Sequence, residues 1–502
     1  MSERFADYDA AINYLTQSTD YERMRRVRYN ADTFSLQRVA GLLAAVGNPH
    51  ERFRSVHIAG TKGKGSTAAM VEAILRQHGL RTGLFVSPHL VDLRERIQID
   101  RELIDRDVMR RMAGRVAEAI DKTLHDDPPT FFEVMTAVGF LAFAEAVVDV
   151  AVIEVGLGGR LDSTNVVRPE VAIITGLSLD HVQQLGPDLA SIAREKAGIA
   201  KAGVPLVVAP QEAEAEAVIA EVAGEVGAPL VRVGLLRPTH DPGGMAAAVC
   251  RHESQTPDEK SSLLHPSPLG EGGPSGPGEG FPPVTSQRQV QFSWHKDFLA
   301  GKPTGRVTVR TARGAYENLL LSLAGRFQGA NAACAVAAAE IVLGERLDAE
   351  KMRTALAAVE WPGRMEVFPG PVTVILDGAH NARSIAELCA AVADYYPGRR
   401  TVYLFAAAAD KDVAGMCREL ARAGAAVIFT KTDNPRAAEP EELAAGLREA
   451  GGTVVGTNPE IAAAMAAAKE TAGEGGVVVA TGSLYLVGAL LKTVGRVNRP
   501  DR

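Results

Sequence analysis

Residues 57–70 have the sequence HIAGTKGKGSTAAM and contain a dense group of side chains that could bind a ligand or take part in catalysis. Glycines let a backbone turn sharply, so that successive N–H groups face an anion, and a helix start adds unpaired N–H donors. The ammonium of Lys64 could reach the outer phosphates of a nucleotide, and the hydroxyl of Ser66 could ligate Mg²⁺. The candidate phosphate-binding residues are Gly60, Thr61, Lys62, Gly63, Lys64, Gly65, Ser66 and Thr67.

This stretch departs from the standard phosphate loop, G-x-x-x-x-G-K-[ST]. The pattern requires glycine at position 58 and a hydroxyl at position 65, where the chain has Ile58 and Gly65. A glycine-rich turn with solvated lysines is therefore the alternative. The apolar strand predicted at 55–59 and the helix predicted at 66–78 favour the phosphate loop, because they supply its usual context.

Three further residues are candidates for catalysis or metal binding. Glu133 lies in an apolar helix predicted at 131–143, where a buried carboxylate is costly unless it is paired or metal-bound. The alternative is that Glu133 lies on an exposed face of this helix. His181 follows a predicted strand and could ligate a second metal or be structural. Lys196 lies in a helical segment at 192–201, and a solvated lysine is its ordinary interpretation.

The elements that must position these residues form two α/β units. Strands predicted at 55–59, 150–155, 171–175 and 205–209 alternate with helices, which indicates a mainly parallel sheet covered on both sides. Arg160 and Asp162 follow one of these strands, at the sheet edge where ligands gather. The Pro-, Gly- and Ser-rich residues 239–288 predict a disordered insertion, followed by a strand at 306–310 and a helix at 331–343.

A second unit follows the hinge-like segment WPGRME at 361–366. Its strands are predicted at 372–376, 401–405, 426–430, 453–456 and 477–481, with helical runs between them. The expected fold class is thus α/β, with a phosphate-loop ATPase-type domain at 1–360 and a smaller Rossmann-like domain at 361–502.

Composition narrows the possible functions. The net charge of −7 gives no reason to expect nucleic-acid binding, which usually needs a basic face. No apolar run reaches the length of roughly 18 residues that spans a bilayer, and no secretory signal is visible. Four well-separated cysteines without a CxxC pair argue against zinc and fit a reducing compartment. We therefore expect a cytoplasmic protein, a monomer, with no membrane or nucleic-acid partner.

Eleven short segments also occur in an order that resembles one family. They are GTKGKGS, SPHLVDLRERI, TFFEVMT, EVGLGGRLDSTN, DHVQQLG, IAREKAGIAK, WPGRME, DGAHN, AAADKD, NPRA and GSLYLVG. The chain resembles the dihydrofolate synthase/folylpolyglutamate synthase branch of the Mur ligase superfamily, over nearly its whole length apart from the insertion. The resemblance implies that the domain at 1–360 is similar to the Mur ligase central domain and binds ATP and folate, and that the domain at 361–502 is a ligase domain that binds glutamate.

The family resemblance implies an ATP-dependent amide ligase with Mg²⁺ as cofactor and ATP as co-substrate. ATP would phosphorylate a carboxylate, and the amine of L-glutamate would attack the acyl phosphate. The acceptor would be dihydropteroate, tetrahydrofolate or its polyglutamate. Bifunctional and monofunctional members share these motifs, and analogy with bacterial members favours a bifunctional enzyme.

The resemblance also assigns roles to individual residues. Ser66 and Glu133 would bind one Mg²⁺, His181 would contribute to a second, and Lys196 would carry a carbamate. The catalytic residues would be Lys64, Lys196, Asp377 and His380, with Asn331, Arg364 and Asp377 contacting the nucleotide. Substrate contacts would come from Ser87, Pro88, His89, Phe131, Arg160, Asp162, His380 and Lys411. Phe131 could instead be a core aromatic and His380 a helix cap, and Phe327 replaces the histidine of many members.

Two other functions compete with this interpretation. A Mur ligase acting on a cell-wall precursor usually carries an extra N-terminal domain, whereas only 54 residues precede the first predicted strand, at 55–59. A nucleotide-binding switch would use the phosphate loop, but it would not need Glu133, Lys196, the DGAHN segment and a second α/β domain together.

Overall fold

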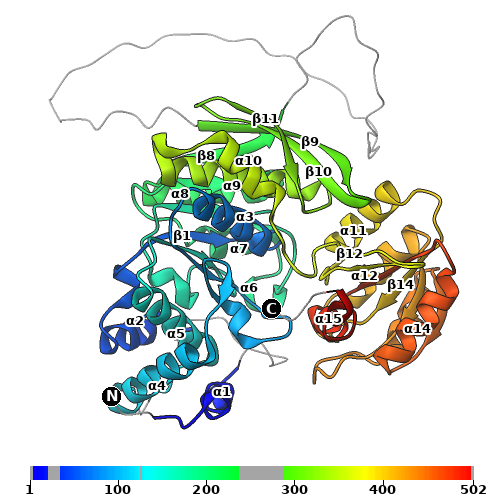
Figure 1. Cartoon of the computed structure of the whole chain (residues 1–502), viewed down its shortest axis with the longest axis horizontal. Helices are drawn as coiled ribbons and strands as arrows, with labels where there is room; N and C mark the ends of the chain where they lie inside the picture. The colour runs from blue at the N-terminus through cyan, green and yellow to red at the C-terminus, as the bar shows by residue number, and fades with distance from the viewer. Residues whose placement is uncertain (1–3, 21–33, 125–126, 237–287, 499–502) are drawn as a thin grey trace, which may run out of the picture. The chain divides into compact units, whose positions relative to one another are not determined.

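The computed structural model describes residues 4–20, 34–124, 127–236 and 288–498. Two β-sheets flanked by helices make up this part of the chain (Figure 1), so the predicted α/β class is confirmed. The insertion predicted at 239–288 lies outside the described residues, except for Arg288, which begins a strand.

The first sheet has eleven strands in the described part of the chain, in the order β11-β10-β9-β8-β7-β6-β1-β5-β2-β3-β4. The strands are β1 (Arg54–Ala59), β2 (Thr82–Phe85), β3 (Ile97–Ile99), β4 (Glu102–Leu103), β5 (Val150–Glu154), β6 (Val171–Ile174), β7 (Leu206–Val208), β8 (Leu230–Leu235), β9 (Arg288–Leu299), β10 (Lys302–Arg310) and β11 (Ala315–Leu321). From β2 to β9 all neighbours are parallel, in agreement with the predicted mainly parallel sheet, although β2 and β8 themselves were not predicted. The strand predicted at 306–310 lies within β10, whereas the other edge strands, β3, β4, β9 and β11, and the antiparallel pairing of these edges were not predicted.

Helices cover both faces of this sheet. They are α1 (Tyr8–Gln17), α2 (Leu36–Ala45), α3 (Lys64–Gln77), α4 (Arg106–Thr123), α5 (Phe131–Glu145), α6 (Val182–Leu185), α7 (Leu189–Ala197), α8 (Ala213–Val226), α9 (Phe327–Leu343) and α10 (Ala349–Ala357). Alternate residues of β5 enter different cores: Val150 and Val152 pack with α3, α9 and α10, whereas Ala151 and Ile153 pack with α4 and α5. The strand is therefore apolar throughout, which is why its sequence shows no alternation.

One helical stretch among the described residues, Phe327–Arg346, is long and apolar enough to cross a membrane by length and composition alone. Its apolar window is 72% buried inside the protein, against α3 and the first sheet. Burial in the core accounts for this composition.

The second sheet has six strands in the order β12-β13-β17-β14-β15-β16. The strands are β12 (Glu366–Phe368), β13 (Thr373–Leu376), β14 (Thr401–Phe405), β15 (Ala426–Phe429), β16 (Thr453–Thr457) and β17 (Val477–Thr481). Only β12 is antiparallel to its neighbour among them. Its helices are α11 (Ala382–Tyr395), α12 (Val413–Arg422), α13 (Pro440–Glu449), α14 (Ile461–Ala472) and α15 (Leu484–Asn498). The boundary predicted at 360/361 falls in the connection between α10 and β12.

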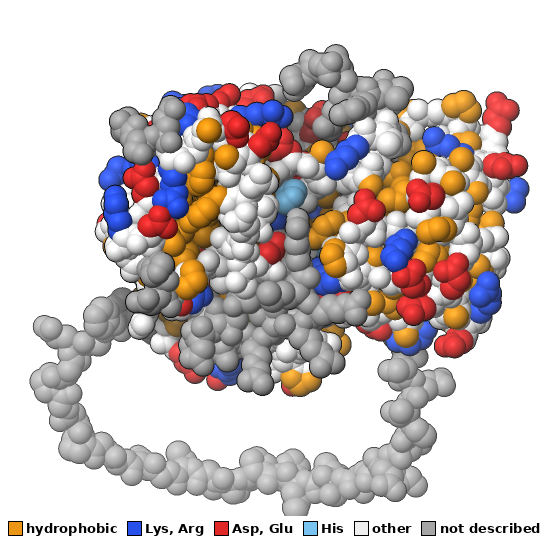
Figure 2. Space-filling view, turned by 90° about the horizontal axis from the view of Figure 1, so that it is seen from below, with side chains coloured by type: hydrophobic (Ala, Val, Ile, Leu, Met, Phe, Trp, Pro, Cys, Tyr) orange, Lys and Arg blue, Asp and Glu red, His pale blue; other side chains and the backbone are white. Residues whose placement is uncertain are grey.

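Charged side chains are mixed in sign on the face shown in Figure 2. Lysine and arginine side chains lie among aspartate and glutamate side chains there, without a broad basic area among the residues it describes. This face agrees with the chain's net charge of −7.

Candidate active site

A cavity of about 350 Å³ lies at the carboxyl ends of strands from both sheets. It is lined by residues that follow β1, β5, β6, β13, β14 and β17, which is where open α/β sheets bind ligands. The predicted site residues that line it are Gly60, Thr61, Lys62, Gly63, Lys64, Gly65, Ser66, Ser87, Pro88, Glu133, Asp162, His181, Lys196, Asn331, Arg364, Asp377, His380 and Lys411.

The glycine-rich turn between β1 and α3 is held in one shape by its neighbours. A Cβ on Gly60 would lie 1.8 Å from Oγ1 of Thr175, and one on Gly63 would lie 2.3 Å from Oδ1 of Asn331. The N–H groups of Thr61 and Lys62 donate to the carbonyl of Gly176 at 3.1 and 3.0 Å. Close packing therefore argues against a merely flexible turn.

The start of α3 offers unpaired donors to an anion. Gly63 is its N-cap, with φ of +89°, and no side chain caps the helix. The first N–H groups of an uncapped helix need partners and carry partial positive charge. The turn and helix start thus have the geometry of a phosphate-binding site.

Lys64 faces a buried carboxylate that the sequence did not single out. Its Nζ lies 3.6 Å from Oε1 of Glu154, the last residue of β5. Burial raises the pKa of Glu154, while the charge of Lys64 acts in the opposite direction. A single charged residue within the apolar run VAVIEV was the available signal for this site residue.

Lys196 is buried, with only 5% of its surface exposed, so it is not a solvated lysine. Burial lowers its pKa to about 7, with a further contribution from the charge of Lys64. Its Nζ makes no hydrogen bond or ion pair with any residue that the structure describes. A large fraction of this amine is therefore neutral, and nucleophilic, near pH 7.

Glu133 is buried, as its apolar neighbours predicted, and its partner is Arg38 on α2. Arg38 donates from Nε to Oε2 at 2.9 Å and from Nη2 to Oε1 at 2.8 Å. The N–H of Thr130 also donates to Oε2 at 2.7 Å, within a capping box at the start of α5. The carboxylate is thus compensated by a cation that lies far from it in the sequence.

The residues around the phosphate loop fit a Mg²⁺ ion that also binds ligand phosphates. Mg²⁺ prefers oxygen donors and usually keeps waters and substrate phosphates as ligands. The hydroxyl of Ser66 and the carboxylates of Glu133 and Glu154 line the same cavity. No group of three His, Cys, Asp or Glu side chains in the described ranges is arranged to hold a metal alone. Phosphate oxygens would therefore complete the coordination.

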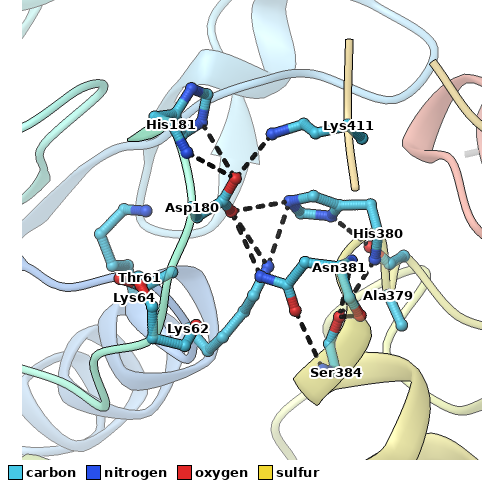
Figure 3. Close-up of polar contacts among 12 residues, drawn as sticks. Thr61, Lys62, Lys64, Asp180, His181, Ala379, His380, Asn381, Ser384 and Lys411 are labelled. Carbon is cyan, nitrogen blue, oxygen red and sulfur yellow. Dashed lines mark hydrogen bonds and ion pairs between the residues drawn. The ribbon is translucent and has the colours of Figure 1, made fainter. Parts of the chain in front are cut away.

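Asp180 is the centre of a charged cluster that joins segments from both sheets (Figure 3). Its Oδ1 accepts from Nζ of Lys411 at 2.7 Å, and its Oδ2 accepts from Nζ of Lys62 and Nδ2 of Asn381, both at 3.4 Å. Burial alone would raise the pKa of Asp180, but the charge of Lys62 and the surrounding donors hold it well below its usual value. Asp180 is therefore an anion.

His380 and His181 flank this anion in different ways. His380 donates from Nδ1 to the carbonyl of Gly378 at 2.8 Å, so its Nε2 is an acceptor, 3.2 Å from Nζ of Lys62. Burial and the charge of Lys62 lower the pKa of His380 to about 4. His181 adopts a left-handed conformation with φ of +52°, and its Nε2 lies 3.9 Å from Oδ1 of Asp180. Such strain in a non-glycine residue is common at functional sites.

Two predicted site carboxylates organise backbone turns. Asp377 accepts from the N–H groups of Met365 and Ala379, at 2.9 and 2.8 Å, and so fixes the connection before β12. Asp162 accepts from the N–H groups of Gly156 and Leu157 at 3.0 and 2.9 Å. Both face the cavity, but their oxygens are already used by the protein.

Four predicted residues do not line the cavity. Thr67 is buried on α3, and Nδ1 of His89 accepts from Nε of Arg96 at 3.0 Å. Phe131 lies in the core under Arg96, as a core aromatic would. The side chain of Arg160 is half-exposed and pairs with Glu195 at 2.8 Å.

Arg436 and Asp410 line the cavity on the side of the second sheet, and neither was predicted as a site residue. Nη1 of Arg436 lies 3.1 Å from Oδ2 of Asp410. Nε of Arg436 and Oδ1 of Asp410 are buried without a partner in the described part of the chain. The segment NPRA, which contains Arg436, was the available signal.

Two family models match this chain. The Mur ligase middle domain matches residues 58–241, and the Mur ligase glutamate ligase domain matches residues 363–484.

Curated relatives match over most of the chain. A dihydrofolate synthase/folylpolyglutamate synthase of Bacillus subtilis is 32% identical over 464 residues, covering 91% of this chain and 94% of the relative. A probable bifunctional folylpolyglutamate synthase/dihydropteroate synthase of Haloferax volcanii is 33% identical over 485 residues. That match covers 96% of this chain but only 50% of the relative, so the chain spans about half the length of the Haloferax protein.

Solved structures have the same fold. Mycobacterium tuberculosis folylpolyglutamate synthase, complexed with ADP and AMPPCP, superposes with a TM-score of 0.78 and 29% identity, covering 99% of this chain and 100% of that one. E. coli FolC in complex with DHPP and ADP superposes with a TM-score of 0.76 and 25% identity, and the match again covers 99% of this chain and 100% of that one.

Proposed function

The chain belongs to the dihydrofolate synthase/folylpolyglutamate synthase family of Mur ligases, and we propose that it joins L-glutamate to a dihydropteroate or folate carboxylate with conversion of ATP to ADP and phosphate. One observation carries the proposal: Lys64, Ser66, Glu133 and His181 line the same cavity as His380 and Lys411, which come from the second sheet. A site for a nucleotide and a site for an amino acid therefore share one space.

The reaction needs an activated acid, because resonance makes a carboxylate a poor electrophile. The acceptor carboxylate attacks the γ-phosphorus of ATP, which forms an acyl phosphate and releases ADP. The amine of L-glutamate then attacks the acyl carbon and displaces phosphate, with loss of one proton from the amine. Relatives solved with ADP, AMPPCP and DHPP support these substrate classes.

Cationic side chains offset the repulsion between the two anions that must meet. At an effective dielectric constant of about 20, two unit charges about 4 Å apart repel by about 4 kcal/mol. Lys62, Lys64 and Lys411 bring ammonium groups to the cavity. Mg²⁺, held by Ser66 and Glu133 with a second ion near His181, would add charge neutralisation at the phosphates.

We assign Lys196 as a carbamate in the working enzyme. Its buried amine, with a pKa of about 7, has the neutral form that carbon dioxide requires. The product is an anion, which suits a metal-rich site better than an ammonium does. Growth with ¹³C-bicarbonate should give a carbamate carbon signal that Lys196→Arg abolishes. A free ammonium at full bicarbonate supply would refute the assignment.

The nucleotide and folate contacts that the family implies are part of this proposal. We assign Asn331, Arg364 and Asp377 to the nucleotide, with Asp377 acting through the backbone turn that it holds. Ser87 and Pro88 would form the folate-side wall of the cavity, which they line.

Glutamate would be held beside the second sheet. The unpaired Nε of Arg436 suits a carboxylate, and the unpaired Oδ1 of Asp410 suits an ammonium. The neutral Nε2 of His380 is placed to accept a proton from an attacking amine. Arg436→Ala should raise the KM for glutamate at least tenfold while it leaves ADP affinity within twofold of wild type.

ADP release tests the proposed activity. The protein would be incubated with ATP, glutamate and either dihydropteroate or tetrahydrofolate. Release that requires both glutamate and an acceptor supports the ligase, and the acceptor that works shows whether the enzyme is bifunctional. ATP hydrolysis without glutamate would instead indicate a nucleotide switch, and release only with a UDP-sugar acceptor would indicate a cell-wall ligase.

We further propose that the enzyme acts as a monomer in the cytoplasm. The one cavity contains residues of both sheets of a single chain, so a second copy is not needed to complete it. Light scattering should give a mass near the 53.1 kDa of one chain.

A further inference from the structure

Gly65 departs from the standard phosphate loop, and the structure gives the reason. It is the second residue of α3, and it is buried. A Cβ at this position would lie 2.8 Å from Cζ2 and 3.0 Å from Nε1 of Trp361. The edge of the indole therefore occupies the space that a serine or threonine side chain would need.

Arg101 holds the indole from another side. Its guanidinium carbon lies 4.8 Å from the centroid of the Trp361 ring, within the range of a cation–π interaction. Its Nη2 also donates to the carbonyl of Glu360. Burial lowers the pKa of the partly buried Arg101, and the negative charge of Glu72, which is fully buried on α3 seven residues after Gly65 and so on the same face, acts in the opposite direction.

The turn that carries Arg101 is strained. Asp100 and Arg101 link β3 to β4 with φ of +52° and +74°, a left-handed conformation that normally favours glycine or asparagine. The N–H of Thr82 donates to Oδ1 of Asp100 at 2.8 Å, and the N–H of Asp100 donates to the carbonyl of Thr82 at 2.9 Å. These bonds fix the turn in the conformation that directs Arg101 to the indole.

The residues that follow Trp361 in the chain enter the active site. Arg364, three residues later, lines the cavity. The N–H of Gly378 donates to the carbonyl of Gly363 at 2.9 Å, and the N–H of Met365 donates to Asp377 at 2.9 Å. The short connection is thus anchored at Trp361 on the phosphate-loop helix and at Asp377 beside the second sheet.

We infer that Trp361 is a positioning residue that couples the phosphate loop to Arg364, with Arg101 holding its indole against Gly65. The inference rests on the proposed nucleotide site. Phosphate binding at the start of α3 is transmitted through the indole to the connection that carries Arg364. Gly65 is glycine because this contact requires it.

A double-mutant cycle tests the contact. In Gly65→Ala the new methyl displaces the indole, and ADP affinity measured by calorimetry should fall at least tenfold. Trp361→Phe removes Cζ2 and Nε1, so Gly65→Ala/Trp361→Phe should recover most of that loss. Gly65→Ala/Trp294→Phe is the matched control, and it should recover none. Additive effects of Gly65→Ala and Trp361→Phe would overturn the inference.

Fluorescence tests the coupling independently. The chain has two tryptophans, so Trp294→Phe leaves Trp361 as the only one. ADP should change its emission, and Arg101→Met should shift the emission of the free protein and reduce the change on binding. An unchanged emission with intact ADP binding would refute the coupling alone. Wild-type protein that does not bind ADP would instead refute the proposed nucleotide site.

Discussion

The buried side chains of this cavity carry charges that depend on partners from distant parts of the chain. Glu133 is 4% exposed and is compensated by Arg38, which belongs to α2. The apolar neighbours of Glu133 in the sequence predicted its burial, because burial follows from local pattern. They did not predict its partner, because a pairing across many residues depends on tertiary packing.

The Arg38–Glu133 pair leads to a stability prediction. Arg38→Met leaves a buried carboxylate without its cation and should lower the free energy of unfolding by about 3–5 kcal/mol. Arg38→Met/Glu133→Gln should restore most of that stability but not the ligase activity. Urea denaturation measures the free energy of unfolding of both variants, and ADP release measures their ligase activity. Arg115→Met, which removes an exposed pair with Glu145, is the control and should cost at most about 1 kcal/mol. An equal cost for both single variants would contradict the prediction.

His57 makes the stability of the protein depend on pH. It is fully buried on β1, and burial lowers its pKa to about 3, from 6.5. Between these values the unfolded chain binds more protons than the folded one, so stability falls as the pH drops below about 6.5. The loss is up to about 1.4 kcal/mol per pH unit, or about 2 kcal/mol between pH 7 and 5.

His57→Asn should reduce this dependence, because the amide does not titrate. Urea denaturation at pH 7 and pH 5 would compare the two proteins. A difference between the two pH values that is as large in the variant as in the wild type would show that other groups cause it.

At the scale of elements, the sequence predicted the central strands β1, β5, β6 and β7 of the first sheet, but of the strands farther out it predicted only part of β10. Strands such as β5 are buried on both faces, so they appear in the sequence as continuous apolar runs. The edge strands β3 and β4 have three and two residues, too few to show a period. β9 begins at Arg288, inside the segment whose composition predicted an insertion, and its polar residues concealed it.

Asp162 and Arg160 were both predicted to contact the substrate, but in the turn after β5 they have different surroundings. Asp162 accepts three backbone hydrogen bonds, from Gly156, Leu157 and Thr164, whereas the half-exposed side chain of Arg160 pairs with Glu195. Asp162→Asn should therefore cost about 1.5–3 kcal/mol of stability and lower kcat/KM at least tenfold. Arg160→Ala should change stability by at most about 1 kcal/mol and leave kcat/KM within threefold. Thermal unfolding and steady-state kinetics compare them, and similar losses in both variants would contradict this assignment.

At the scale of the whole molecule, Asp180 connects segments that follow strands of both sheets. It neutralises Lys62 from the turn after β1 and Lys411 from the turn after β14. Sequence pattern placed Lys62 in the turn after the strand predicted at 55–59, whereas Lys411 was identified only through the family resemblance. Local pattern specifies which strands exist, and it does not specify how two sheets meet.

Asp180→Asn should loosen this connection in the free protein, because an amide does not neutralise two lysines. Hydrogen exchange at residues 358–365, which join the two sheets, should become faster by tenfold or more. A nucleotide supplies negative charge to the same lysines and should restore part of the protection. Glu195→Gln, which removes only the surface pair with Arg160, should leave exchange there unchanged. Equal exchange in Asp180→Asn and wild type would contradict this role.

The parallel pairing of β8 with β9 has a practical consequence for engineering. Because the two neighbouring strands run the same way, Leu235 at the end of β8 pairs with Phe292, and Arg288 at the start of β9 pairs with Val231. A tether from Leu235 to Arg288 needs to return only along one strand, about 15 Å at roughly 3.3 Å per residue. A flexible linker of about a dozen glycines and serines is long enough to replace residues 237–287. The same two ends offer an attachment point for a fluorescent reporter, at the opposite side of the sheet order from the β3-β4 edge.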